Sequence, residues 1–350
     1  MAQSLAVKYR PTTWEAVTEQ SSVITILQNQ LRANEVKHAY LFCGGAGTGK
    51  TTCARIFANE INHGAGNPIE MDAASNNSVD DIRTIADQAK LKSLDSDYKI
   101  YIIDECHALS NSAWQAMLKL IEEPPVATIF IFCTTDPQKI PKTILSRVQR
   151  YDFQRISEDG IFTRLHRILY EEDIYASSDE LNDTLPALEY IAKLADGGMR
   201  DAITMLDKCL SYSTELTVAN VVKALGVANY ETMQKLTDAV IGFKADDAVK
   251  IITDVHTSGI DLKQFVRQYL QFMVDVNVWL LTGKIALTTL PATDELQRWL
   301  ISVDSKDDFG LCSGLLDMIM TLNSEIKWET NPKMIVLARF MSYIEEVRTT

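Results

Sequence analysis

The sequence predicts an α/β domain with a parallel sheet, followed by an all-α region, and three observations support this division. Short apolar runs alternate with helical patterns up to about residue 155, and strand signals end near Ile156. A glycine-rich phosphate-binding pattern follows the first apolar run. Acidic and basic residues nearly balance in residues 1–155, at 17 against 16, whereas residues 156–350 hold 30 against 18. Uninterrupted apolar strands indicate a parallel sheet with helices on both faces.

The elements of the α/β part follow from length and periodicity. The predicted strands are Ala39–Cys43, Ile69–Met71, Ile100–Asp104 and Ile129–Thr134, with a further strand-like run at Arg150–Phe153. The predicted helices between them are Ser22–Leu31, Thr51–Ile61, Val79–Ala89 and Ser112–Glu122. The last of these stops at Pro124 and Pro125, because proline cannot continue a helix.

The remaining residues are predicted to be helical. Residues 158–228 show short helices with breaks at Ser177-Ser178 and Gly197-Gly198. Longer helices are predicted at Glu231–Phe243, Ala245–Ser258, Leu262–Leu281, Asp294–Ile301, Phe309–Lys327 and Pro332–Val347. Pro332 suits the first position of the final helix. We therefore expect three domains: 1–156, 157–228 and 229–350.

Composition excludes several classes of protein. The chain has 350 residues, 46% hydrophobic and 23% charged, and no run of membrane-spanning length. The N-terminus lacks the apolar segment of a secretory signal, so we expect a cytoplasmic protein. Six scattered cysteines without a CxxC pair argue against zinc and disulfide frameworks. A net charge of −13 argues against tight autonomous nucleic-acid binding.

A glycine-rich loop follows the first predicted strand. Residues 44–51 read GGAGTGKT, which matches GxxxxGK[ST] between a strand and a helix. Glycines let backbone N–H groups curve around phosphate oxygens, and the helix N-terminus adds its positive dipole. We expect Lys50 to reach the β- and γ-phosphates and Thr51 to bind Mg²⁺. The loop residues expected to bind nucleotide are Gly45, Gly47, Thr48, Gly49, Lys50, Thr51 and Thr52.

Two carboxylates end the strand at Ile100–Asp104. Asp104 and Glu105 are expected at the carboxyl edge of the sheet, where open α/β sheets bind ligands. We expect Asp104 to hold Mg²⁺ and Glu105 to polarise the attacking water as a general base. The nearby His107 is interpreted as a structural spacer.

Polar and basic residues further along the chain can act on the γ-phosphate. The strand ending at Thr134 is followed by Thr135, and either hydroxyl could orient the water or contact the phosphate, with Thr135 the first candidate. Arg147 follows a loop, and Arg200 begins a helix of the second predicted domain. Because guanidinium groups suit phosphate, we expect one arginine to act on its own nucleotide and one on a neighbour's.

Taken together, these motifs resemble the AAA+ clamp-loader ATPases, and most closely the bacterial DNA polymerase III gamma/tau family. The similarity is dense to about residue 225 and weak in the last 120 residues. Besides the phosphate loop, the matching stretches are Lys8–Pro11, His38–Phe42, Asp72–Ser75, Val79–Arg83, Asp104–His107, Leu118–Pro125, Thr134–Pro141, Thr143–Arg147 and Gly198–Ala202.

The resemblance implies a ring-shaped, magnesium-dependent ATPase built from copies of this chain and homologous subunits. ATP binding opens a sliding clamp and places it on primer–template DNA through backbone contacts that are not sequence-specific, and hydrolysis releases the clamp. No membrane takes part. In this family, residues 157–228 correspond to a helical lid and residues 229–350 to a collar that holds the ring together.

The resemblance also implies roles for particular residues. Tyr9, Arg10 and Pro11 border the adenine. Thr135 is sensor 1, and Arg200 is sensor 2 in the lid. Arg147 is the arginine finger that completes the neighbouring subunit's site.

The chain departs from the family pattern in several places. Only Asn62–Asn67 occupies the position of the usual four-cysteine module, so we expect no zinc site. Val148 replaces the usual cysteine after Arg147, and Asn76 replaces a usually basic residue, which leaves Lys119 as a DNA-backbone contact. We expect the chain to end with the collar and to lack the extensions of the long form. These features fit a bacteriophage, hence a host cytoplasm, or a divergent bacterium.

Three alternatives remain. Another AAA+ replication machine, such as a helicase loader or a branch-migration motor, shares the loop and the acidic pair but not the combination of KYRP, EEPP and TDPQK. A non-hydrolysing clamp-loader subunit typically has a degraded phosphate loop, whereas Lys50, Thr51, Asp104 and Glu105 are intact here. A P-loop small-molecule kinase would have little use for the long helical region.

Overall fold

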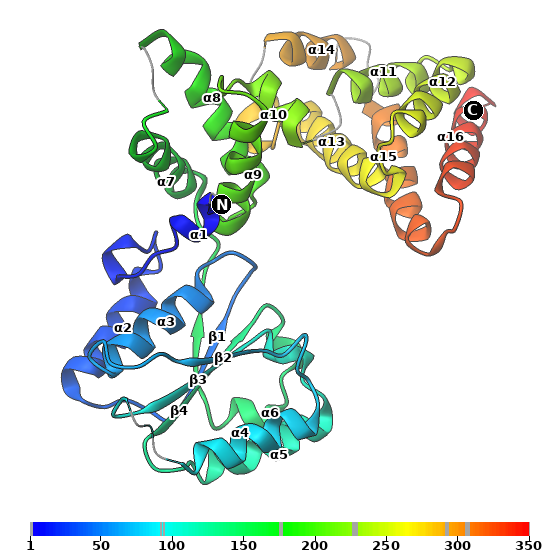
Figure 1. Cartoon of the computed structure of the whole chain (residues 1–350). Coiled ribbons are helices and arrows are strands. Elements are labelled where there is room, and N and C mark those ends of the chain that lie inside the picture. The colour runs from blue at the N-terminus through cyan, green and yellow to red at the C-terminus, as the bar shows by residue number, and fades with distance from the viewer. Residues whose placement is uncertain are drawn as a thin grey trace. The chain divides into compact units, whose positions relative to one another are not determined.

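The computed structural model describes residues 3–349 except 92, 94, 175–177, 226–229, 291–293 and 305–308. The chain, drawn in Figure 1, divides into two compact units, Met1–Leu210 and Ser211–Thr350. All strands of the described residues belong to the first unit. The division into three domains stays a prediction. Its expected boundary at 228/229, and the break expected at Ser177, lie outside the described residues.

Five parallel strands form one sheet in the order β2-β3-β4-β1-β5. They are β1 (Ala39–Cys43), β2 (Ile69–Asp72), β3 (Lys99–Asp104), β4 (Thr128–Thr134) and β5 (Gln149–Asp152). Within β1, Phe42 lies opposite Cys133 on one side and Tyr151 on the other. The predicted parallel sheet is therefore confirmed, including the strand-like run near residue 150.

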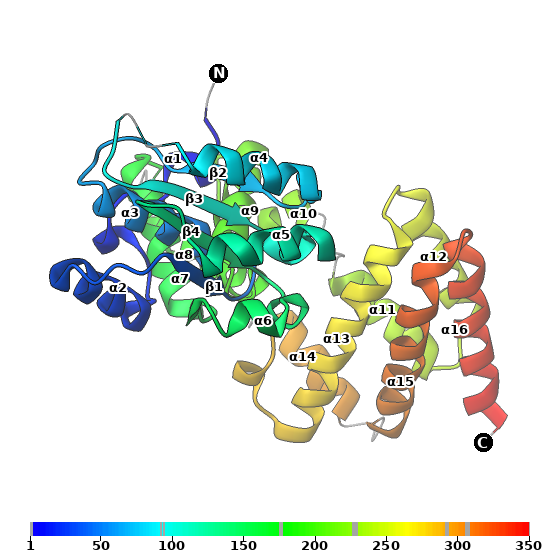
Figure 2. The same cartoon turned by 90° about the horizontal axis from the view of Figure 1, so that it is seen from below.

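Helices cover both faces of the sheet, as Figures 1 and 2 show. The layers are α2 (Ser21–Ala33) and α3 (Lys50–Ile61) on one face, and α4 (Val79–Ala89), α5 (Asn111–Glu122) and the short α6 (Lys142–Leu145) on the other. Tyr40 and Phe42 point into the first layer, whereas Leu41 and Cys43 point into the second. Both faces are buried, which explains why the strands are apolar throughout rather than alternating.

The strand order gathers three strand ends in the middle of the sheet. From β1 the chain crosses to the edge strand β2, returns through β3 and β4, and then passes β1 to reach β5. The carboxyl ends of β1, β3 and β4 are Cys43, Asp104 and Thr134. These residues are followed by the phosphate loop, Glu105 and Thr135. The fold therefore places these three parts of the predicted site at one edge of the sheet.

Three helices follow the sheet: α7 (Glu158–Glu171), α8 (Ser178–Leu194) and α9 (Met199–Tyr212). Ser157 begins α7 as its N-cap, because its side chain accepts a hydrogen bond from the Gly160 N–H. The N-terminal α1 (Leu5–Lys8) is tied to α9, since the Leu5 N–H donates to Asp207 Oδ2 at 3.1 Å. Helix α1 is therefore attached to α9, one of the helices that follow the sheet.

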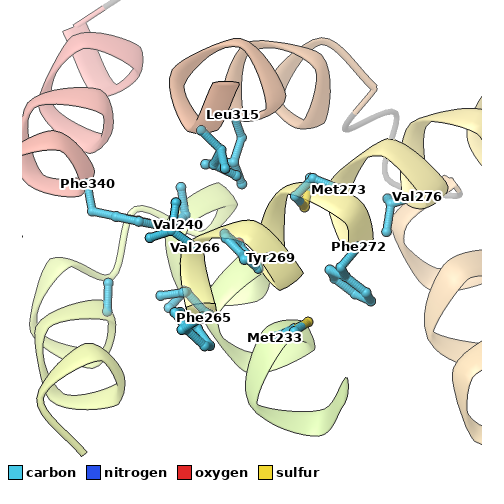
Figure 3. Close-up of a cluster of buried hydrophobic side chains, with 14 of the residues drawn as sticks. Met233, Val240, Phe265, Val266, Tyr269, Phe272, Met273, Val276, Leu315 and Phe340 are labelled. Atoms are coloured by element: carbon cyan, nitrogen blue, oxygen red, sulfur yellow. The ribbon is translucent and has the colours of Figure 1, made fainter. Parts of the chain in front are cut away.

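The described part of the second unit is helical, as predicted. Its α-helices are α10 (Val218–Leu225), α11 (Tyr230–Ile241), α12 (Ala245–Thr257), α13 (Leu262–Thr282), α14 (Asp294–Asp304), α15 (Phe309–Glu325) and α16 (Pro332–Thr349). Figure 3 shows side chains of α13, among them Phe265, Tyr269 and Phe272, in one buried cluster with Leu315 and Phe340. Within the residues described, no helix meets the length and apolarity needed to cross a membrane.

A hydroxyl pair in this cluster gives a stability test. The hydroxyl oxygens of Tyr269 and Thr237 lie 2.9 Å apart, and both side chains are buried. Burial raises the pKa of Tyr269, so the phenol stays neutral. We expect Tyr269→Phe to lower the free energy of unfolding by about 1 kcal/mol, because the ring stays packed and one hydrogen bond is lost. Urea unfolding measures this, with the exposed Tyr212→Phe as control. Equal stabilities of the two variants would contradict the expectation.

Candidate nucleotide-binding site

The phosphate loop joins β1 to α3 in a backbone shape that requires glycine. Gly47 and Gly49 have φ values of 69° and 99°, in the left-handed region that glycine adopts freely. Gly47 also approaches α9 closely, since a Cβ atom on it would lie 3.0 Å from Gly198 Cα. The Met199 N–H donates to the Gly47 carbonyl at 3.1 Å. The loop is thus in direct backbone contact with the start of α9.

Lys50 is buried at the first position of α3. Its Nζ donates to the carbonyls of Gly44 at 3.0 Å and Gly45 at 2.7 Å. Burial lowers the pKa of this ammonium, and the carboxylates of Glu105 and Asp104 oppose that shift. Lys50 is therefore placed where it can bind an anion, and its ammonium group is hydrogen-bonded to the loop carbonyls in this structure.

Thr51 and Asp104 are brought together although 53 positions separate them in the sequence. The Thr51 hydroxyl donates to Asp104 Oδ2 at 2.7 Å, and the Glu105 N–H donates to Asp104 Oδ1 at 2.9 Å. A hydroxyl beside a carboxylate is a pair of hard oxygen ligands, which suits Mg²⁺. In the described part of the chain, no group of three or more His, Cys, Asp or Glu could hold a metal ion.

Glu105 adopts a left-handed backbone conformation directly after β3, with φ 45°. Its Oε2 accepts a hydrogen bond from the Thr135 hydroxyl at 2.9 Å and lies 3.2 Å from His107 Nδ1. Thr134, the second candidate, is fully buried, and its hydroxyl oxygen lies 3.2 Å from the same His107 nitrogen. Thr135 thus contacts the expected general base directly, whereas Thr134 is buried and contacts His107.

A cavity of about 270 Å³ opens beside the loop and collects most of the predicted residues. Those that line it are Tyr9, Arg10, Pro11, Gly47, Thr48, Gly49, Lys50, Thr51, Thr52, Asp104, Glu105 and Arg200. Gly45, Thr135 and Arg147 do not line it, although Gly45 and Thr135 bond to Lys50 and Glu105. The cavity lies between the N-terminal segment, the loop and the start of α9, which suits a ligand with both a ring and phosphates.

Cationic side chains converge on this cavity. Burial lowers the pKa of Arg10, and the nearby cations Arg55 and Arg200 lower it further. Four cations line the cavity beside three carboxylates, and gathered cations favour a polyanionic ligand; the cations are Arg10, Lys50, Arg164 and Arg200, and the carboxylates are Asp104, Glu105 and Asp201.

One cation of the cavity, Arg164, stands in no motif of the sequence. It donates to the Tyr9 carbonyl at 2.9 Å, and its guanidinium carbon lies 6.0 Å from the centroid of the Tyr9 ring. Helical spacing is the signal that could have identified it. Arg164 follows the buried Ile161 by three residues, so the two side chains lie on the same, inward face of the helix.

The N-terminal wall of the cavity is anchored to α7. Lys8 Nζ and the Tyr9 hydroxyl both donate to Glu172 Oε1, each at 2.5 Å. The hydrogen bonds from Lys8 and Tyr9 lower the pKa of Glu172. The predicted adenine-binding segment is therefore held against the helices that follow the sheet, and not against the sheet alone.

Arg147 lies away from the cavity of its own chain. Its guanidinium pairs with Glu122 Oε1 at 2.8 Å and donates to the Thr143 carbonyl at 2.8 Å. The side chain is 40% exposed. Arg147 is thus partly exposed, and it does not line the cavity that Lys50 and Arg200 line.

Comparison with known proteins gives consistent matches along the chain. A family model described as DNA polymerase III, delta subunit, matches residues 19–77 and 68–157. A model described as DNA polymerase III subunits gamma and tau domain III matches residues 216–334. The chain is 34% identical to DNA polymerase III subunit tau of Bacillus subtilis, over 95% of this chain and 61% of that protein.

Further matches concern length and fold. The chain is 32% identical to DNA polymerase III subunit gamma of Buchnera aphidicola, over 79% of this chain and 80% of that protein. It spans only 44% and 56% of two Mycoplasma gamma/tau relatives, so both of these relatives are much longer. Among solved structures, the RuvB Holliday junction branch migration motor of Thermotoga maritima matches with a TM-score of 0.51 and 18% identity, over 72% of this chain and 86% of that one. At that identity the likeness concerns the fold alone.

Proposed function

The chain belongs to the gamma/tau family of DNA polymerase III subunits, and from this premise we propose that it is an ATPase subunit of a sliding-clamp loader. The family predicted from the sequence is thereby confirmed. One observation carries the proposal of an active ATPase: Lys50, Thr51, Asp104 and Glu105 all line one cavity at the carboxyl edge of the sheet. A subunit that had lost hydrolysis would not need to keep all four.

The proposed ligands are ATP and Mg²⁺. Lys50 would exchange its two loop carbonyls for phosphate oxygens, and Thr51 with Asp104 would hold the metal ion. When bound, the metal ion neutralises charge on the phosphates. Tyr9, Arg10 and Pro11, which line the same cavity, would border the adenine.

Hydrolysis would depend on Glu105 as general base. In the structure its Oε2 accepts the Thr135 hydroxyl, so the carboxylate is held in place beside the expected sensor 1 residue. Arg200, at the start of α9, is proposed to contact the nucleotide of its own chain as sensor 2. Arg147, which lies outside that cavity, is proposed as the finger for the neighbouring chain.

The partners follow from the same premise. We propose a ring of copies of this chain and homologous subunits, in which residues 157–228 act as lid and residues 229–350 as collar. The ring would act in the cytoplasm on a sliding clamp and on the backbone of primer–template DNA. Lys119 remains the proposed DNA contact. The absence of a zinc site and a bacteriophage origin stay predictions.

Steady-state ATP hydrolysis tests the proposal. The purified chain would be assayed alone, and then with related subunits, primed DNA and the cognate clamp. We expect slow turnover alone and a strong increase only when DNA and clamp are both present. If DNA and clamp left the rate unchanged, the nucleotide site would stand, and another AAA+ replication machine such as a helicase loader would become the better proposal.

The variant Glu105→Gln separates ATP binding from hydrolysis. We expect it to lower the hydrolysis rate of the full assembly by about 100-fold, because an amide cannot accept the proton from the attacking water. ATP affinity should change little, since the amide is isosteric with the carboxylate. Equilibrium binding of a fluorescent ATP analogue and phosphate release measure the two properties. Retention of the wild-type rate would remove Glu105 from the role of base.

A further inference from the structure

Two adjacent residues before α2 are held in an unusual backbone conformation. Glu19 and Gln20 have φ values of 58° and 59°, which is the left-handed region. Glycine, asparagine and aspartate visit this region most readily, whereas glutamate and glutamine rarely do. Two such residues in succession persist only where surrounding contacts determine them. The contacts of both side chains explain the conformation.

Gln20 connects the phosphate loop to the segment that leaves β5. Its side chain is buried, at 8% exposure. Its Nε2 donates to the Gln154 carbonyl at 2.7 Å and lies 3.4 Å from the Thr48 carbonyl, while its Oε1 accepts from the Gln154 N–H at 3.1 Å. One carboxamide thus pairs with both backbone groups of Gln154 and also reaches the loop.

Glu19 connects the same turn to the start of α7. Its Oε2 accepts the Ser157 N–H at 3.1 Å, and its Oε1 accepts the Ser157 hydroxyl. Ser157 is the N-cap of α7, so the carboxylate also lies where a helix N-terminus favours negative charge. The fit is tight, because a Cβ atom on Gly160 would lie 2.6 Å from Glu19 Oε1.

The loop meets the post-sheet helices at a second place as well. Gly47 contacts the start of α9 through the Met199 N–H, as described above. Next to it, the Ile156 N–H donates to the Gly197 carbonyl at 3.1 Å, and a Cβ on Gly197 would lie 2.6 Å from Arg155 Cβ. The segment 154–157 is therefore fixed between Glu19 and Gln20 on one side and the start of α9 on the other.

We propose that Glu19 and Gln20 are positioning residues that couple occupancy of the phosphate loop to the placement of α7 and α9. The inference rests on the proposed ATPase function and deepens it. When the loop closes on phosphate, the Thr48 carbonyl moves. Because Gln20 contacts this carbonyl and also Gln154, Gln154 moves with it. Glu19, which is adjacent to Gln20 and bonded to Ser157, moves Ser157 in turn. Movement of the segment 154–157 shifts α7, because Ser157 is its N-cap, and it shifts the start of α9, because Ile156 is bonded to Gly197. The shift of α9 moves Arg200 toward the phosphates. Neither Glu19 nor Gln20 lines the cavity, so neither touches the nucleotide.

The test separates nucleotide binding from the response of the helices. Spin labels on cysteines introduced at Thr25 of α2 and Tyr170 of α7, both exposed, report the distance between the sheet layer and α7. All six native cysteines are buried, so labelling favours the introduced ones. We expect the distance distribution of the wild-type chain to shift on adding ATP-Mg²⁺. In Gln20→Leu the shift should be lost and turnover should fall about tenfold, while the ATP dissociation constant changes less than about threefold.

Two further variants keep the proposal falsifiable if Gln20→Leu does not fold. Gln20→Asn keeps a residue that tolerates the left-handed backbone, but its shorter side chain cannot reach Gln154. Gly160→Ala displaces the Glu19 carboxylate through its added Cβ while favouring the helix. Both should bind ATP and lose the distance shift. The matched control is Gln138→Leu, an exposed glutamine, which should behave as wild type.

The outcomes distinguish this inference from the proposed function. Loss of the shift with retained ATP binding supports the inference. A wild-type chain that hydrolyses ATP without any distance shift overturns the inference and leaves the ATPase proposal standing. A normal shift in Gln20→Asn and Gly160→Ala overturns it equally. A wild-type chain that binds no ATP overturns both.

Discussion

Replacing Lys50 with alanine is expected to abolish ATP binding at concentrations where the wild-type chain is saturated. The ammonium is the buried cation at the centre of the loop, and its two hydrogen bonds go to carbonyls that phosphate oxygens would replace. Charge-assisted hydrogen bonds contribute about 1.5–3 kcal/mol each. Loss of two or three of them lowers affinity by about 100-fold or more. Titration calorimetry with ATP-Mg²⁺ measures the change.

The control for this variant is Lys37→Ala. Lys37 is an exposed lysine shortly before β1, so its removal lowers the net charge equally without touching the loop. Circular dichroism should show that both variants keep the helical content of the wild-type chain. Undiminished ATP affinity in Lys50→Ala would contradict the assignment of residues 44–51 as the phosphate loop.

The parts of the fold that the sequence predicted are those with a local physical signature. The strands are buried on both faces, so β1 and β4 appear as unbroken apolar runs. The phosphate loop needs glycine at defined positions because of its backbone angles, and this makes the motif visible without structural information. The acidic pair is recognisable because it ends one of those apolar runs.

The parts that escaped prediction depend on contacts between distant positions. Arg164 reaches the Tyr9 carbonyl across 155 positions, and Gln20 reaches Gln154 across 134. Neither residue stands in a motif, and glutamine in a left-handed turn has no compositional signal.

Two of the site assignments required geometry. The sequence leaves Thr134 and Thr135 as neighbouring candidates, and only their burial and contacts in the structure distinguish them. Thr134 is the last residue of the strand and fully buried, whereas Thr135 lies beyond it and bonds to Glu105. Likewise, the sequence predicts that two arginines serve different nucleotides. The structure places Arg200 in the cavity and Arg147 outside it, which supports that expectation and leads to a direct test.

The variant Arg147→Ala is expected to bind ATP normally and to lower hydrolysis in the assembled ring by about 1,000-fold, the scale of an arginine finger. Its own cavity keeps Lys50, Glu105 and Arg200, so binding should not suffer. The control Arg150→Ala removes another exposed arginine, which pairs with Asp152, and should leave turnover close to wild type.

Mixing two inactive variants decides whether Arg147 acts on a neighbour. A chain with Arg147→Ala retains Glu105, and a chain with Glu105→Gln retains Arg147. Where the two adjoin in a ring, the intact arginine of one can complete the intact cavity of the other, so the mixture should regain part of the activity that each lacks alone. If Arg147 served its own chain, every site in the mixture would still lack either the base or the finger. Mixed rings that form, as shown by co-purification of differently tagged chains, yet stay inactive would therefore refute the action in trans.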